Sequence, residues 1–201
     1  MLAAALAPPV VFTAVVAVAG GLALAELWTL RRAGLAAAFE LMVLLIGLAA
    51  LTILQAFGDA GAAHGAANGL PVWLLLAIIT TWAADVGAYV FGSLWGRRKI
   101  APSISPGKTW EGTFGGFGAA ALAVLALAAL FGLGRPSAAV FAVTIGPVAF
   151  LGDLLESWVK RRAGVKDSGT LLPGHGGMLD RIDSLLAVAT LIAVGFATTL
   201  G

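Results

Sequence analysis

The chain has 201 residues, of which 60% are hydrophobic and only 11% are charged. Soluble domains carry roughly 25% charged residues, so this composition excludes an ordinary soluble domain. The net charge of +2 is small, and the absence of cysteine excludes a disulfide framework and thiolate metal sites. Because the apolar residues form runs that reach the roughly 20 residues needed to cross a bilayer, we expect an integral membrane protein with no nucleic-acid partner.

Six apolar runs predict an all-α, polytopic membrane protein folded as one domain over residues 1–201. The N-terminal spans occupy 1–69 and carry nothing diagnostic of function, whereas the polar residues concentrate in 70–201. The first span begins at a Pro-Pro pair, a position that suits proline because a helix's first turn has no use for its missing N–H. The predicted spans are 8–29, 35–57, 70–95, 112–134, 137–159 and 183–200.

The basic residues predict the orientation of these spans. Eleven of the twelve Lys and Arg residues fall on one side, and only Arg135 falls on the other. The positive-inside rule assigns the larger set to the cytoplasm, so both termini are expected to be external. The polar loops 96–111 and 160–182 then lie together on the cytoplasmic face, where a charged substrate would arrive from the cytosol.

Asp85 is an acid inside the third predicted span. An ionisable group within a spanning helix is a functional candidate by default because burying it in lipid is costly. The alternative is a structural hydrogen bond to a neighbouring Thr, Tyr or Trp side chain.

The loop 96–111 carries Ser105, Lys108 and Thr109 ahead of a helix expected to start at Gly112. Gly107-Lys108-Thr109 resembles the end of a phosphate-binding P-loop, but the motif's first glycine would fall at Pro102 and no strand is expected before it, so we reject that interpretation. A lysine and three hydroxyl groups before a helix still predict an anion site. The alternative is an ordinary helix-entry loop with Thr109 as the cap.

Four polar residues mark the end of the fifth predicted span. Asp153, Glu156, Ser157 and Lys160 follow the spacing i, i+3, i+4, i+7, so they share one face of a helix. Lysine and arginine at a helix end commonly extend toward the headgroups, which explains Lys160 and the two arginines that follow it. It does not explain Asp153, whose short side chain lies deeper and requires a partner or a metal ion.

Asp180 and Asp183 lie three residues apart where the sixth span begins. Acids at a helix N-terminus are favourable, so simple capping is one interpretation of Asp183. We favour another, in which Asp153, Asp180 and Asp183 meet across two neighbouring helices. Clustered carboxylates in a chain without cysteine favour a hard cation such as Mg²⁺.

A glycine-rich passage, Pro173-Gly174-His175-Gly176-Gly177, lies between these acids. Glycines permit positive φ and let backbone N–H groups approach a phosphate closely. His175, Gly176 and Gly177 are therefore candidate substrate contacts, although His175 could also be a loop residue without a role.

Together these residues resemble the phosphatidate cytidylyltransferase, or CDP-diacylglycerol synthase, family. The resemblance covers roughly residues 80–185 and rests on three motifs in the family's order. They are Asp85-x-Gly87-Ala88-Tyr89, then Ser105-Pro106-Gly107-Lys108-Thr109-Trp110-Glu111-Gly112, and then the run formed by Ser157-x-x-Lys160-Arg161, Lys166-Asp167, Pro173–Gly177 and Asp180-Arg181-x-Asp183.

The resemblance implies an enzyme that makes CDP-diacylglycerol and pyrophosphate from CTP and phosphatidic acid with Mg²⁺. It also implies a homodimer in the bacterial cytoplasmic membrane, with the active site facing the cytoplasm. The site could take a second, monovalent cation as well. One departure is that bacterial members usually have further N-terminal membrane helices.

The resemblance also implies a role for each polar residue. The metal would be held by Asp153, Asp180 and Asp183, which with Ser157 and Lys160 form the catalytic group. The phosphates and nucleotide would be bound by Ser105, Lys108, Thr109, Arg161, Lys166, His175, Gly176, Gly177 and Arg181. Asp85 and Glu156 would support the metal site from behind.

Two other functions stay open from the residues alone. A transporter would use Asp85 and Asp153 as ion or proton ligands. A CTP-dependent polyprenol or dolichol kinase would share features of the CTP site but transfer the γ-phosphate instead of the cytidylyl group.

Overall fold

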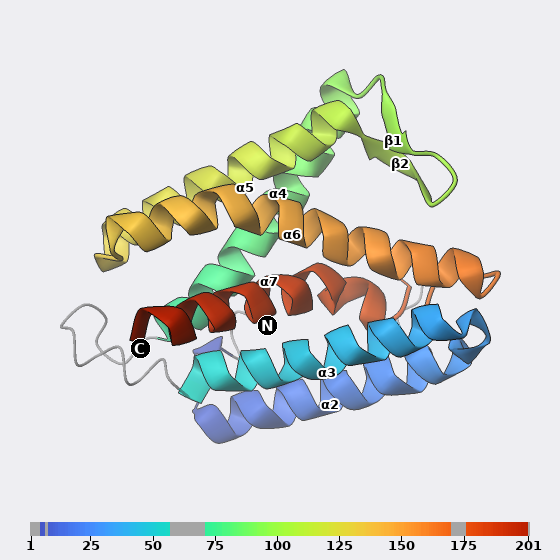
Figure 1. Cartoon of the computed structure of the whole chain (residues 1–201), viewed down its shortest axis with the longest axis horizontal. Coiled ribbons are helices and arrows are strands. Elements are labelled where there is room, and N and C mark those ends of the chain that lie inside the picture. Colours follow the sequence, from blue (N-terminus) through green and yellow to red (C-terminus); the bar gives the residue numbers. More distant parts are fainter. Residues whose placement is uncertain (1–4, 7, 57–70, 170–175, 201) are drawn as a thin grey trace.

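A computed structural model describes residues 5–6, 8–56, 71–169 and 176–200. Pro173, Gly174 and His175 lie outside the described residues, and so does the external loop expected at 58–69. The described residues form six long helices, whose arrangement Figure 1 shows. They are α2 (Pro9–Thr29), α3 (Leu35–Ala56), α4 (Val72–Trp95), α5 (Trp110–Phe131), α6 (Arg135–Arg162) and α7 (Leu179–Leu200), with a short 3₁₀ turn η1 (Arg31–Ala33) between α2 and α3.

The expectation of an all-α polytopic membrane protein is confirmed. Five helices, α2 to α6, are long and apolar enough to cross a bilayer. Helix α7 is also 22 residues long, and its polar residues are concentrated in its first turns. The observed boundaries agree with the predicted spans to within a few residues. The largest difference is at the start of α7, which begins at Leu179 and not at the predicted residue 183. Helix α6 extends to Arg162, so the polar residues from 153 to 160 all belong to one continuous helix.

Helix α7 is the central element of the bundle. It packs between α6 on one side and α3 on the other, while α2 covers the outer face of α3 (Figure 1). Helix α4 crosses behind α7 and makes its most extensive contact with α5, which in turn packs on α6. This arrangement brings the start of α7 against the end of α6, although the described parts of the chain between them are separated by the segment 170–175.

One element departs from the purely helical expectation. The loop 96–111 contains an antiparallel hairpin of β1 (Lys99–Ala101) and β2 (Ser105–Thr109), with Lys99 opposite Thr109. The hairpin leads directly into α5, which begins at Trp110 and not at Gly112. The expected cap is present, since the Thr109 hydroxyl accepts a hydrogen bond from the N–H of Gly112 at 3.2 Å.

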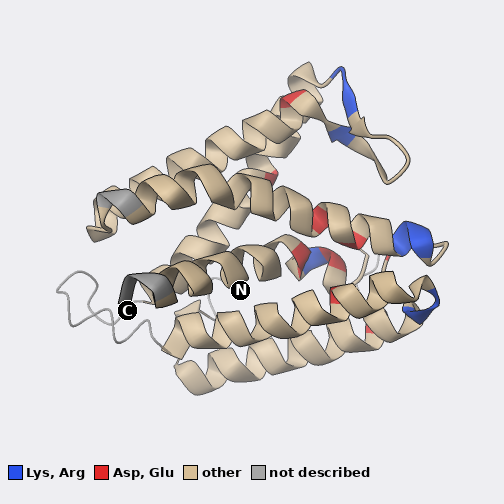
Figure 2. Ribbon diagram, viewed as in Figure 1, with Lys and Arg blue, Asp and Glu red and all other residues tan. Residues whose placement is uncertain are grey.

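Apart from Arg135, the lysines and arginines gather at one end of the molecule (Figure 2). The hairpin, the turn between α2 and α3, and the end of α6 all lie at this end, and the described chain termini lie toward the other. The charge asymmetry that the sequence predicts is therefore present in three dimensions. The assignment of this end to the cytoplasm stays a prediction.

Small residues let α4 and α5 approach each other closely. Gly116 of α5 lies against α4, where an added Cβ would be 2.7 Å from the carbonyl oxygen of Ala84 and 3.1 Å from the Cβ of Ala88. Close approach through glycine and alanine is a common way for helices to associate in membranes, where burial of apolar surface gives little driving force. This contact also supports the hairpin, which joins α4 to α5.

We expect Gly116→Ala to destabilise the protein by about 1–3 kcal/mol, because the methyl group has no room at this contact. The measurement is thermal unfolding of the detergent-extracted protein. Gly118→Ala on the same helix is the control, since an added Cβ there meets nothing within 4 Å; its effect should stay within about 0.5 kcal/mol. Equal effects of the two substitutions would contradict the close α4–α5 packing.

Candidate active site

A cavity of about 520 Å³ lies between α4, α5, α6 and the hairpin strand β2. Most of the residues in its wall are glycine, alanine and phenylalanine. The polar groups that line it come from three separate parts of the sequence and include Asp85, Ser105, Lys108, Thr109 and Asp153. Asp85 therefore faces a cavity, as expected for a functional acid in a spanning helix.

Lys108 connects the hairpin to α6. Its ammonium group forms a short ion pair with the carboxylate of Asp153 and lies 4.9 Å from the ring centroid of Phe150. The lysine side chain is 18% exposed and the aspartate 38% exposed, so the pair lies at the boundary of the cavity and is accessible. The positive charge is held in place by a carboxylate and an aromatic face.

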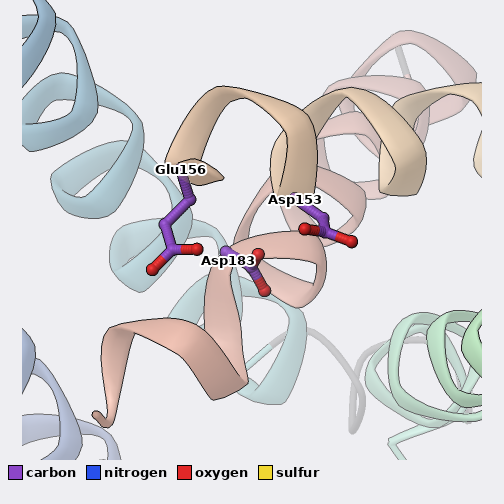
Figure 3. A group of neighbouring side chains, drawn as sticks. All are labelled: Asp153, Glu156 and Asp183. Atoms are coloured by element: carbon purple, nitrogen blue, oxygen red, sulfur yellow. The ribbon is translucent and has the colours of Figure 1, made fainter. Parts of the chain in front are cut away.

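Three carboxylates from α6 and α7 converge beside this ion pair (Figure 3). Asp153, Glu156 and Asp183 each offer one oxygen, and these three oxygens lie within 4.8 Å of one another. Glu156 is 1% exposed and Asp183 is 8% exposed. One oxygen of Glu156 has no hydrogen-bond partner among the described residues. Buried acids at this spacing repel one another unless a cation or a proton compensates them, so the cluster could hold a metal ion.

Lys160 forms the other side of the acid cluster. Its ammonium group lies 2.7 Å from Glu156 and 2.5 Å from Asp180, and the residue is 9% exposed. The predicted helical face of α6 is therefore real: Glu156 pairs with Lys160, and the Ser157 hydroxyl lies 3.4 Å from Asp153. Two lysines thus flank the cluster, one from the hairpin and one from α6.

The structure brings Glu156, and not Asp180, into the three-acid cluster. Asp180 lies one turn before Asp183 on α7 and takes four other donors. They are the Lys160 ammonium group, the Gly177 N–H at 2.7 Å, and the N–H and hydroxyl of Ser168 at 3.2 and 3.0 Å. Asp180 is thus adjacent to the cluster through Lys160. Asp153 and Asp183 meet as expected.

The glycines after His175 contact Asp180. Gly176 has a φ of 80°, and a Cβ there would lie 2.6 Å from the Asp180 carboxylate. The Gly177 N–H already donates to the same carboxylate. In this structure, therefore, the Gly177 N–H is bonded to Asp180 and is not free to bind a phosphate.

The remaining basic candidates lie on the exposed end of the site. Arg161 donates to the carbonyl oxygens of Ile104 at 3.1 Å and Val165 at 3.0 Å, so it ties the hairpin to α6. Lys166 and Arg181 are exposed.

Two buried glutamates of the N-terminal spans were missed by the sequence analysis. Glu26 accepts hydrogen bonds from residues at the start of α7. Glu40 is 1% exposed, has an oxygen without a hydrogen-bond partner in the described structure, and is close enough to Lys160 and Asp183 for their charges to interact. Each is the single charged residue of an apolar helix. The cost of burying a charge in lipid, which makes Asp85 a functional candidate, makes both glutamates candidates as well.

The fold and the site define a polytopic membrane protein with a lysine- and carboxylate-lined site at the polar end of its helix bundle, suited to charged, phosphate-bearing groups. Residues 63–199 match the profile of the cytidylyltransferase family, and the chain belongs to this family. The resemblance drawn from the three motifs is thereby confirmed.

Curated relatives of this chain carry the name phosphatidate cytidylyltransferase. The protein from Brucella suis biovar 1 is 50% identical over 115 residues, which are 55% of this chain and 42% of the relative. The one from Haemophilus influenzae is 46% identical over 124 residues, 57% of this chain and 42% of the relative. The one from Pseudomonas aeruginosa is 43% identical over 136 residues, 63% of this chain and 47% of the relative. The match thus spans less than half the length of each relative.

Proposed function

We propose that this protein transfers the cytidylyl group of CTP to phosphatidic acid, giving CDP-diacylglycerol and pyrophosphate. The observation that carries the proposal is the pairing of a three-acid cluster, two of whose members are buried, with Lys108 and Lys160 at the boundary of a cavity in the helix bundle. The names of the relatives agree with it. In a multi-pass protein with this polar end in the cytoplasm, CTP would arrive from the cytosol and phosphatidic acid from the bilayer.

The acid cluster fits a divalent cation such as Mg²⁺. Its donors are all carboxylate oxygens, which hard cations prefer, and one oxygen of Glu156 is buried without a hydrogen-bond partner among the described residues. Asp153, Glu156 and Asp183 would hold the ion, and Asp180 would act through Lys160. A bound Mg²⁺ would supply positive charge for the triphosphate oxygens. A second, monovalent cation stays a prediction.

The chemistry needs no protein nucleophile. A phosphate oxygen of phosphatidic acid forms a bond to the α-phosphorus of CTP, the bond from that phosphorus to the bridging oxygen breaks, and pyrophosphate leaves with the electron pair. The protein's contribution is to position the two phosphates and to neutralise their charge. Lys108 is placed to contact phosphate oxygens in the cavity, and Lys160 to do so from the opposite side of the acid cluster.

The other polar residues have supporting roles in this proposal. Ser105 and Thr109 line the cavity beside Lys108 and supply hydroxyl groups, and Asp85 faces the same space. Arg161, Lys166 and Arg181 would attract the anionic substrates to the exposed end. The homodimer that the family resemblance implies stays a prediction.

Labelled CTP tests the proposal directly. With phosphatidic acid and Mg²⁺, the purified protein should transfer label from α-labelled CTP into lipid, and chelation of divalent ions by EDTA should remove the activity. CTP labelled in the γ-phosphate should give labelled pyrophosphate and unlabelled lipid. Label passing from the γ-phosphate into lipid would instead indicate a lipid kinase, and no transfer from either position would overturn the proposed function.

A further inference from the structure

Glu26, near the end of α2, contacts the segment that joins α6 to α7. Its carboxylate accepts hydrogen bonds from the N–H groups of Met178 at 2.8 Å and Leu179 at 2.9 Å, and from the Ser168 hydroxyl at 3.1 Å. It is 8% exposed. One side chain from α2 therefore contacts residues on both sides of the 170–175 segment. Ser168, on one side, is more than 140 positions from Glu26 in the sequence.

Ser168 links Glu26 to the acid that pairs with Lys160. Its hydroxyl oxygen lies 3.1 Å from Glu26 and 3.0 Å from Asp180, and the single hydroxyl proton serves one carboxylate at a time. Asp180 also takes the N–H of Gly177. Glu26 and Asp180 thus bind three consecutive N–H groups, 177 to 179, at the start of α7. Such groups have no partner within the helix, and they favour negative charge.

The local sequence leaves space for this carboxylate. A Cβ on Gly169 would lie 2.7 Å from one oxygen of Glu26, and a Cβ on Gly177 would collide with its other oxygen and with the Ser168 hydroxyl. Larger residues at either position would push the glutamate away from the loop. The glutamate and the glycines therefore form a matched set from distant parts of the chain.

We propose that Glu26 is a positioning residue for the active site, an inference that rests on the proposed function. By fixing Ser168 and the first turn of α7, Glu26 orients Asp180, which holds Lys160 against Glu156 and the acid cluster. Glu26 lies outside residues 63–199, the part of the chain that matches the family. In this proposal, helix α2 thus supports the active site in addition to spanning the membrane.

Kinetics of Glu26→Gln separate positioning from simple stability. Glutamine keeps the shape but loses the charge and one acceptor oxygen. We expect kcat per mole of monodisperse protein to fall by on the order of tenfold to a hundredfold, since small misplacements of catalytic groups have effects of this size. KM for CTP should stay within about threefold, because Glu26 itself does not contact the substrate. Thr13→Ala is the control on the same helix; Thr13 is exposed and its hydroxyl donates to the carbonyl oxygen of Pro9, so kcat should not change.

A second measurement does not depend on activity. The chain has no cysteine, so Met178→Cys introduces a unique thiol beside the contact. The rate of maleimide labelling of this thiol should rise on the order of tenfold when Glu26→Gln is added. The reason is that the hydrogen bonds from residues 178 and 179 to the Glu26 carboxylate hold the start of α7 in place. Thr13→Ala should leave the labelling rate unchanged.

The outcomes distinguish the two proposals. If the unmodified protein makes no CDP-lipid, the proposed function fails, and a rise in labelling still supports the contact between Glu26 and α7. If the unmodified protein is active and Glu26→Gln keeps its kcat, the positioning role is overturned, whatever the labelling shows. If Glu26→Gln lowers only the protein yield and leaves kcat per mole unchanged, the positioning role is also overturned.

Discussion

Asp153→Asn is expected to lower kcat by about a thousandfold, the size of effect seen when a preorganised electrostatic group is removed from an active site. Asp153 is the one residue that belongs both to the cavity and to the acid cluster, and it also pairs with Lys108. Its amide analogue keeps the size of the side chain but removes the charge that holds the lysine and would hold a cation. The measurement is CDP-lipid formation from α-labelled CTP, normalised to membrane-inserted protein.

Two further measurements make this prediction specific. Raising the Mg²⁺ concentration should recover part of the activity of Asp153→Asn if Glu156 and Asp183 still offer their oxygens. Thr144→Ala, a change at a partly buried residue of the same helix whose hydroxyl donates to the helix's own backbone, should keep full activity. If Asp153→Asn stays fully active, the acid cluster is not the catalytic centre.

Lys160→Met is expected to remove activity and stability together. The substitution leaves Glu156 and Asp180 without the cation that lies 2.7 and 2.5 Å from them. Removing one member of a buried ion pair costs about 3–5 kcal/mol because the remaining charge is uncompensated. We expect a clear fall in the thermal unfolding temperature of the extracted protein and no detectable CDP-lipid product.

A double substitution separates the two effects of Lys160. Adding Glu156→Gln to Lys160→Met removes one uncompensated charge, so part of the stability should return while the activity stays absent. Arg162→Met is the matched control, since Arg162 is an exposed cation of the same helix that lies over the Trp158 ring. Its effect on stability should be within about 1 kcal/mol. Equal losses of thermal stability for Lys160→Met and Arg162→Met would show that the buried ion pairs of Lys160 do not stabilise the protein more than an exposed cation does.

The N-terminal helices α2 and α3 each bring one buried glutamate close to the site. Glu26 of α2 holds the start of α7, and Glu40 of α3 lies near Lys160 and Asp183. Both helices also pack directly in the bundle, α3 on α7 and α2 on α3. In the described part of the chain, the two N-terminal helices thus pack against the elements that carry the polar site.

The signal for these two glutamates was present in the sequence. Glu26, Glu40 and Asp85 are each the single charged residue of a long apolar helix. The cost of burying a charge in a membrane applies to all three equally. Only Asp85 lies within a recognisable motif, and attention to motifs alone passed over the other two.

The sequence by itself determined the spanning helices, the gathering of basic residues at one end, the helical face of α6 from Asp153 to Lys160, and the family. The first three features depend on local periodicity and composition, which are properties of short segments. The family was indicated by the resemblance of three short motifs. Only the tertiary structure decided that Glu156 joins Asp153 and Asp183, that Asp180 binds Lys160, and that Glu26 reaches the start of α7. Which side chains meet between two helices depends on their relative rotation and offset, and these are set by packing contacts from the whole bundle.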